Sequence, residues 1–289
     1  MDRLTFFVAP EQAGRTVRSL LRRELHMAEG LISSVKFRPD GILLNGNPVH
    51  TDVRVRAGDI LSVSVADRGR NEAAPLDLSL PIPWEDDALA VIDKPAGIGV
   101  YGEGTPNIAG ILAYKWGANI EFHPVNRLDV GTSGLMVTAK DGYTHDRLRR
   151  LLHTGDFRRE YLALAEGVLP KSAGTIDLPI GRAPVEGTRR AVAPGGLPCR
   201  TDYEVLGSDG QRTLLRLRLH TGRTHQIRVH MAALGHPLVG DRLYGASDTA
   251  LARPALHSHH LRLVHPITGA IIEVTSPLPP DMAALADRI

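Results

Sequence analysis

A single carboxylate, Asp129, lies in a segment rich in glycine and hydroxyl residues that leads into an apolar strand. The segment reads N-R-L-D-V-G-T-S-G over residues 126–134 and contains no second acid that could share a proton with Asp129. Arg127 lies two residues away, and a nearby cation favours the ionised form of a carboxylate. An isolated, ionised carboxylate in a loop suits nucleophilic attack or the stabilisation of positive charge. The structural alternative is an Asp that caps its own turn.

The segment around Asp129 resembles the hallmark loop of RluA-type pseudouridine synthases, H-R-L-D-x-x-T-S/T-G, with Asn126 in place of the usual His. Three further stretches match the family and follow in the family's order between about residues 84 and 275. They are D-K-P-A-G at 93–97, R-E-Y-L-A-L at 159–164, and T-G-R-T-H-Q-I-R-V-H-M at 221–231 with G-H-P-L-V-G-D at 235–241. Together the four motifs are specific, whereas an isolated R-L-D would not be.

The resemblance implies a role for each matching residue. Asp129 would act at the anomeric carbon of a uridine, either by attacking it or by stabilising positive charge while a base removes a ribose proton. Tyr161 would stack on the uracil, and Arg228 would pair with Asp129 and keep it ionised. Arg127 would insert into the RNA when the uridine flips out, a step that costs a few kcal/mol. Four other motif residues are expected to contact RNA, namely Asn126, Arg223, His225 and Gln226.

Each of these roles has a structural alternative. Tyr161 lies in a predicted strand over residues 161–165, where a tyrosine often packs into the core. Arg228 lies in a predicted helix over 224–233, where an arginine often faces solvent. Only the position of each residue within its motif favours the catalytic role.

Pseudouridine formation breaks the bond between a uracil nitrogen and the ribose, and rejoins base and sugar through carbon. The reaction is an isomerisation without a redox step or a donated group, so neither a cofactor nor a metal is expected. The histidines give no metal-ligand pattern. His225 and His230 are five residues apart and do not share a helix face, and the group between residues 257 and 265 has no acid or cysteine at ligand spacing.

The composition is that of a globular protein. The chain has 289 residues, 43% of them apolar, and a single cysteine, Cys199, which excludes a disulfide framework and fits a reducing compartment. No signal peptide and no membrane-spanning stretch is apparent, so a soluble, cytoplasmic monomer is expected. The net charge is only +2, but five of the 34 basic residues are Lys and the other 29 are Arg. Arginine suits phosphate binding and base stacking, although codon bias explains the excess equally well.

The pattern of the N-terminal part predicts a separate small domain. It comprises helices over residues 14–25 and 28–35, a hairpin around Asn45-Gly46, and a strand over 60–65. This arrangement resembles the S-four-like RNA-binding module, whose closing phrase V-x-x-G-D-x-L/I-x-V matches residues 55–63. The arginines of the first helix would then bind phosphates. The alternative is a structural cap on the main domain.

Beyond residue 66 we expect a polar, proline-rich linker over 67–83 and a larger domain over 84–289. Strands are predicted there over 89–92, 135–139, 161–165, 213–219, 256–263 and 271–274, and helices over 108–116, 142–152 and 224–233. Strands that outnumber scattered helices predict an α+β fold with a mixed, mostly antiparallel sheet rather than regular βαβ units.

The sequence therefore predicts an RNA pseudouridine synthase that acts on structured RNA, with ribosomal RNA favoured over transfer RNA. One alternative is an RNA-binding protein that has the fold but no activity, which an intact set of Asp129, Tyr161 and Arg228 disfavours. A second alternative is a hydrolase of small substrates that uses Asp129 or Ser133. However, G-T-S-G over residues 131–134 is one residue shorter than the elbow of serine hydrolases.

Overall fold

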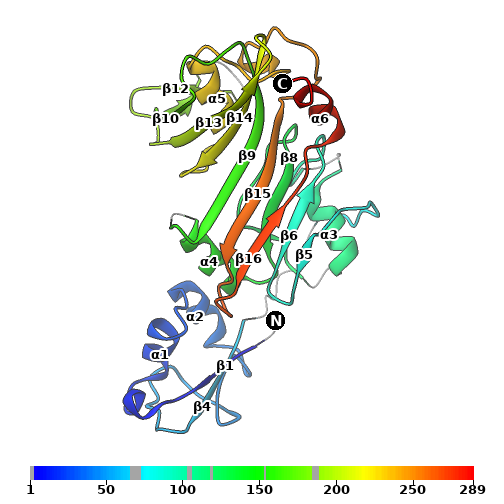
Figure 1. Ribbon diagram of the computed structural model, residues 1–289. Coiled ribbons are helices and arrows are strands. Elements are labelled where there is room, and N and C mark those ends of the chain that lie inside the picture. Colours follow the sequence, from blue (N-terminus) through cyan, green and yellow to red (C-terminus); the bar gives the residue numbers. More distant parts are fainter. Residues whose placement is uncertain (1–2, 66–72, 103–105, 118–119, 153, 184–188) are drawn as a thin grey trace.

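The computed structural model describes residues 3–65, 73–102, 106–117, 120–152, 154–183 and 189–289. Figure 1 shows a small N-terminal region below a long, twisted sheet, with helices on both sides of that sheet. No helix within the described ranges is both long and apolar enough to cross a membrane.

The N-terminal region is a four-stranded antiparallel sheet with two short helices. Its sheet has the order β1-β4-β2-β3. Its elements are β1 (Arg3–Phe7), a 3-10 turn η1 (Pro10–Gln12), α1 (Val17–Arg23), α2 (Glu29–Val35), β2 (Ile42–Leu44), β3 (Asn47–Pro48) and β4 (Ile60–Ser64). Helix α1 starts later than predicted because the Thr16 side chain caps it by accepting a hydrogen bond from the Ser19 amide. The hairpin turn falls at Asn45 and Gly46 as predicted, and both residues have positive φ.

The two regions share a packed contact. Tyr143, in the helix α4 (Gly142–Leu151) of the C-terminal region, is buried among the apolar side chains of the N-terminal core. Its hydroxyl donates a hydrogen bond of 2.9 Å to the carbonyl oxygen of Leu25, just beyond α1. One aromatic side chain of the larger region therefore completes the core of the smaller one.

The C-terminal region is built on a ten-stranded mixed sheet. Eight strands follow the order β10-β13-β14-β9-β15-β8-β6-β5, while β16 pairs with β15 and β7 with β8. All pairs are antiparallel except β15 with β8. The strands are β5 (Trp84–Glu85), β6 (Leu89–Lys94), β7 (His123–Pro124), β8 (Ser133–Ala139), β9 (Phe157–Glu166), β10 (Ala173–Asp177), β13 (Arg200–Ser208), β14 (Arg212–Leu219), β15 (Leu256–Val264) and β16 (Ile271–Thr275).

Successive side chains along the central strands point to opposite faces of this sheet, and both faces are buried. Ile92 and Met136 belong to a core that includes α3 (Ile108–Trp116), whereas their neighbours Val91 and Val137 pack into a core that includes α4. A strand buried on both faces reads as a continuous apolar run, which is the pattern of β6 and β8. The remaining elements are the β11 (Ile180–Arg182) and β12 (Arg190–Val192) hairpin, α5 (Gln226–Ala233), a 3-10 turn η2 (Arg242–Tyr244) and α6 (Pro280–Ala286).

The predicted α+β class with a mostly antiparallel sheet is confirmed. The prediction missed the outer strands β10 and β13, because polar residues on their exposed face interrupt the apolar pattern. Of the expected linker, residues 66–72 lie outside the described ranges. Its second half packs on the large sheet: the Leu76 amide bonds to the Gly110 carbonyl oxygen in α3, and the Asp93 amide bonds to the Pro81 carbonyl oxygen.

Candidate active site

Asp129 lies in the loop between β7 and β8, and the backbone of this loop is tightly held. The Thr132 amide donates to the Asp129 carbonyl oxygen at 3.0 Å and closes the turn. At the end of the loop, Gly134 has φ of +104° and lies so close to β15 that an added Cβ would be 2.2 Å from the Ser258 carbonyl oxygen. Only glycine fits both the conformation and the space. The loop thus presents Asp129 from a fixed position at the start of β8.

Arg228, in the first turn of α5, lies directly beside Asp129. Its Nη1 lies 3.2 Å from Oδ2 of Asp129. Its Nε and Nη2 donate to the two carboxylate oxygens of the buried Asp241 at 2.7 and 2.8 Å. Burial opposes the charge of Arg228, but the hydrogen bonds and charge of Asp241, helped by Asp129, raise its pKa above the usual value. A permanently charged, doubly anchored guanidinium therefore faces Asp129.

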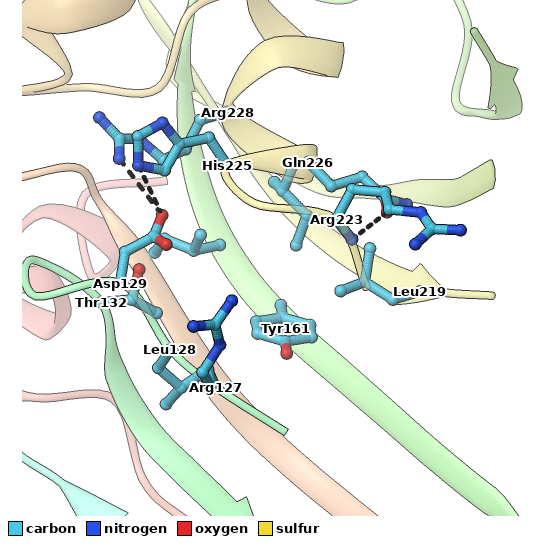
Figure 2. Close-up of a pocket in the computed structure, with 12 residues that line it drawn as sticks. Arg127, Leu128, Asp129, Thr132, Tyr161, Leu219, Arg223, His225, Gln226 and Arg228 are labelled. Carbon is cyan, nitrogen blue, oxygen red and sulfur yellow. Dashed lines mark hydrogen bonds and ion pairs between the residues drawn. The ribbon is translucent and has the colours of Figure 1, made fainter. Parts of the chain in front are cut away.

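His225 is a second side chain near Asp129, and it carries a positive charge only when it is protonated. Its Nε2 lies 3.8 Å from the same oxygen, Oδ2, and its Nδ1 lies 2.8 Å from the hydroxyl of Tyr244 in η2. Burial lowers the pKa of His225, and Arg228 lowers it further, while Asp129 works in the opposite direction. Figure 2 shows His225 and Arg228 side by side, both turned toward Asp129.

Tyr161 lies on β9 at the other side of the same pocket. Its ring is buried, and this burial raises the pKa of its hydroxyl. In Figure 2 the side chain of Arg127 reaches into the space between Asp129 and Tyr161. The pocket has a volume of about 50 Å³. This is narrow for a pyrimidine base, and the side chain of Arg127 takes up part of the entrance. Arg127 is exposed and forms no ion pair within the described residues, so it is the side chain best able to move.

Lys94, at the end of β6, lies beneath the Asp129 loop and is completely buried. Its Nζ donates to the carbonyl oxygens of Pro95, Ile98 and Val130 at 2.9, 3.0 and 3.3 Å. Burial lowers its pKa to about 8, although the charge of Asp129 acts against that shift. Lys94 therefore ties the turn after β6 to the residue that follows Asp129.

Two of the residues predicted to contact RNA are buried in this structure. Asn126 is buried, and its amide oxygen accepts a hydrogen bond from the Val137 amide. Gln226 is also buried, and its carboxamide bonds to Thr221, Arg200 and Thr201 and to the amide of Arg223. Both side chains therefore help to hold the fold, while the Asn126 amide nitrogen has no partner among the described residues and Gln226 lines the pocket. Their contacts with RNA stay predictions. Arg223, in contrast, is exposed at the pocket rim and stays a candidate RNA contact.

Sequence reasoning overlooked three residues that support the site, namely Lys94, Asp241 and Tyr244. Lys94 and Asp241 lie within motifs that the sequence had already marked, D-K-P-A-G and G-H-P-L-V-G-D. That position was the available signal for both. Tyr244 lies three residues beyond the second of these motifs, and nothing in the sequence indicated it.

A second pair of residues superficially resembles a hydrolase site. Oγ of Ser133 lies 3.0 Å from Nδ1 of His257, and both residues are buried. Nε2 of His257 contacts the Ser276 carbonyl oxygen at 3.2 Å, so Nε2 carries the proton and Nδ1 accepts from Ser133. Neither side chain lines the pocket. This pair holds β8 against β15 and does not present a nucleophile. Within the described ranges there is also no group of three or more side chains suited to hold a metal.

Comparison with known proteins identifies the family. Residues 88–233 match the family model described as RNA pseudouridylate synthase. The chain belongs to the RNA pseudouridylate synthase family. It is 37% identical over 291 aligned positions to the uncharacterized RNA pseudouridine synthase YhcT of Bacillus subtilis, covering 98% of this chain and 96% of the relative. It is 44% identical to the ribosomal large subunit pseudouridine synthase D of Nitrosomonas europaea over 73% of this chain and 66% of that protein.

Among solved structures, the human RNA pseudouridylate synthase domain containing 1 matches with a TM-score of 0.59 and 29% identity. The match covers 71% of this chain and 87% of that one. The predicted membership of the family, the α+β fold and the activity as an isomerase that forms pseudouridine in RNA are thus confirmed. The roles of individual site residues are not tested by these comparisons.

Proposed function

We propose that Asp129 acts at the anomeric carbon of a uridine that has been flipped out of structured RNA, with ribosomal RNA as the substrate class. One observation carries the proposal: Asp129 is the only acid among the side chains that line the pocket between α5 and β9. Breaking the glycosidic bond creates positive charge at the anomeric carbon, so a carboxylate is the group needed there.

The contacts of Asp129 suit such a role. Arg228 and His225 both lie at Oδ2, and within the described residues Oδ1 has no hydrogen-bond partner. In the covalent route, Oδ1 bonds to the anomeric carbon while the uracil nitrogen leaves with the bonding electrons. The base then turns, its carbon 5 attacks the anomeric carbon, and the Asp129 ester breaks. Carbon 5 then loses its proton and the released ring nitrogen gains one, which restores the aromatic base and completes the isomerisation. The alternative route, through removal of a ribose proton, stays open.

We assign the opposite wall of the pocket to the base. The buried ring of Tyr161 offers a flat apolar surface for stacking. Because burial raises the pKa of its hydroxyl, Tyr161 is neutral at physiological pH and can donate a hydrogen bond. Arg127 occupies the space that a base would need, so it must swing outward as the base enters. We propose that it then fills the gap left in the RNA, and that the exposed Arg223 binds a phosphate.

Ribosomal RNA is favoured over transfer RNA by the names of relatives. Ribosomal large subunit pseudouridine synthases D of Nitrosomonas europaea and Haemophilus influenzae are 44% and 41% identical to this chain. We also propose that residues 1–66 form a separate RNA-binding module and that the protein is a cytoplasmic monomer. Light scattering during size-exclusion chromatography tests the oligomeric state.

Two other functions are less well supported. An inactive RNA-binding protein would not need the arrangement at Asp129. There, Arg228 is fixed by Asp241 and contacts one carboxylate oxygen, while the other oxygen, Oδ1, faces the pocket without a hydrogen-bond partner among the described residues. A hydrolase that uses Ser133 would need that hydroxyl in the pocket, yet Ser133 is buried against His257.

Tritium release from RNA labelled at carbon 5 of uridine separates these functions. Wild-type protein should release tritium from large-subunit ribosomal RNA without any added cofactor. Asp129→Asn should lower the rate at least about a thousandfold, several kcal/mol in the transition state, with RNA affinity nearly unchanged. Glu204→Gln is a matched control, because Glu204 pairs with Arg216 on the exposed surface. Activity of Asp129→Asn within tenfold of wild type would refute the assignment.

A further inference from the structure

The hydrogen-bond pattern around Tyr244 favours one tautomer of a neutral His225. The hydroxyl oxygen of Tyr244 accepts a hydrogen bond from the Arg190 amide at 3.0 Å. Its own proton is then free to point at Nδ1 of His225, which lies 2.8 Å away. A neutral imidazole that accepts at Nδ1 must carry its proton on Nε2. That nitrogen is the one that faces Asp129.

The backbone at His225 is unusual in a way that serves this orientation. His225 has φ of +59° and ψ of 18°, the left-handed conformation, immediately before α5 begins. Such a conformation costs a non-glycine residue roughly 1 kcal/mol or more and persists only where the surroundings enforce it. The ring is held by Tyr244, whose plane it meets edge-on at 82° with centroids 5.6 Å apart. Backbone and ring contacts together aim Nε2 at the carboxylate.

We propose that His225 is a positioning residue for pseudouridine formation: as the neutral Nε2–H form set by Tyr244, it acts with Arg228 to hold Oδ2 of Asp129. Oδ1 is then the oxygen that faces the anomeric carbon. This proposal rests on the proposed role of Asp129. It replaces the earlier expectation that His225 is mainly an RNA contact. In the present structure the Nε2–Oδ2 separation is 3.8 Å, and it is expected to shorten when RNA fills the pocket.

The charges that face His225 come from four separate elements. They are Asp129 in the loop before β8, Arg228 in α5, Asp241 before η2, and Arg190 in β12. Burial and the two arginines favour the neutral ring, while the two acids favour the charged one. A protonated ring would carry a proton on Nδ1 as well, so the Tyr244 hydroxyl would have to turn its own proton away from Nδ1. Acid should therefore disrupt the arrangement.

Single-turnover kinetics with saturating RNA tests the proposal. His225→Asn is the variant to use, because Asn tolerates the left-handed conformation and its shorter carboxamide does not reach Asp129. We expect the rate to fall about 10- to 100-fold, with the dissociation constant for RNA unchanged. His236→Asn is the matched control, because the His236 side chain, among the described residues, bonds only to the Glu166 carbonyl oxygen and should keep the wild-type rate. Equal melting temperatures establish that both variants fold.

Tyr244→Phe allows a measurement, the pH–rate profile, that would not change if His225 had only a structural role. The variant keeps the ring over Arg228 but loses the donor to Nδ1, which stabilises neutral His225. The pKa of His225 should rise, so the acid limb of the pH–rate profile should shift upward. Nitrogen-15 NMR of the imidazoles, with the His225 signals identified from the His225→Asn spectrum, should show the proton on Nε2 in wild type.

Two results would overturn the proposal. One is a His225→Asn protein that binds RNA more weakly but reacts at the wild-type rate when saturated, since His225 would then be an RNA contact. The other is a wild-type spectrum with the proton on Nδ1. Failure of the Asp129 assignment would look different, because Asp129→Asn would then stay active whatever the result for His225.

Discussion

Asp129 and Asp241 lie on opposite sides of one guanidinium group, that of Arg228. Asp241 is almost fully buried and takes two hydrogen bonds from Arg228, whereas Asp129 is partly exposed and takes one. The two acids therefore have different tasks. Asp241 fixes and neutralises the arginine, and the remaining donor of the arginine holds the carboxylate that faces the pocket.

Asp241→Ala should destabilise the fold as well as the active site. Removing one partner of a buried ion pair leaves an uncompensated charge, and we expect a loss of about 3–5 kcal/mol in the free energy of unfolding. Urea denaturation measures the loss, and tritium release measures the accompanying fall in activity.

Asp281→Ala is a matched control for this prediction. Asp281 also accepts two hydrogen bonds from one arginine, Arg253, both at 2.8 Å, but its side chain is 42% exposed. Because the Asp281 carboxylate stays partly hydrated, its loss should cost less than the loss of the buried Asp241. Equal losses from the two variants would show that burial of the Arg228–Asp241 pair does not matter.

Lys94 should make stability depend on pH in the alkaline range. Its pKa is lowered from 10.5 to about 8 in the folded protein, mainly by burial. Between these values the unfolded chain binds the proton and the folded protein does not, so stability rises with pH across this window. Below about pH 8 both states are protonated and the contribution is constant.

Urea denaturation of wild type and Lys94→Met from pH 7 to 10.5 checks this dependence. The variant should be the less stable protein at each pH, because three buried carbonyl oxygens lose their donor. The difference in free energy of unfolding should widen above pH 8. A constant or shrinking difference would mean that the three carbonyl oxygens hold the proton against burial.

Gly134→Ala should prevent close packing of β8 on β15. The added Cβ would lie 2.2 Å from the Ser258 carbonyl oxygen at a φ of +104°, so both overlap and backbone strain arise. These effects cost about 1–3 kcal/mol each. Gly155→Ala is the control, because nothing lies within 4 Å of its added Cβ. Thermal melting compares the two, and a Gly134→Ala protein as stable as the control would contradict the close approach.

The sequence indicated three residues that line one pocket in the structure, because motif and element agreed. Asp129, Tyr161 and Arg228 are far apart in the chain, yet each falls where a predicted loop, strand or helix could present it. Local patterns do not reveal what a polar side chain bonds to. Asn126 and Gln226 looked functional beside their motifs, but long-range folding buries them against Val137 and Thr201.

The arginines of the first helix illustrate the same limit. They were expected to form a free basic face, and Arg18, Arg22 and Arg23 are indeed exposed. However, Arg15 pairs with Glu24, and Arg18 pairs with Glu29. Periodicity placed these side chains on a helix surface, but only the packing of α1 against α2 brings Glu29 beside them. Fewer charges are therefore available for phosphate than the sequence suggested.

Deleting residues 1–66 should weaken binding to large RNA while sparing the chemistry. The active-site residues all lie beyond residue 90, and the contact of the two regions runs through Tyr143 at the far end of β8 from Asp129. The truncated chain should carry Tyr143→Ser, because the ring would otherwise lose its apolar surroundings.

Each phosphate contact contributes about 0.7–0.9 to the slope of log affinity against log salt. Among the arginines at positions 15, 18, 22 and 23, Arg15 and Arg18 have close acidic partners, Arg22 lies 3.8 Å from Glu29, and Arg23 has no ion pair within the described residues, so the slope should fall by about one to two. Filter binding at several salt concentrations measures it, and full-length Tyr143→Ser is the control. Tritium release from a short stem-loop at saturation should be unchanged. A folded truncated protein without turnover on that stem-loop would show that the N-terminal region is part of the active site.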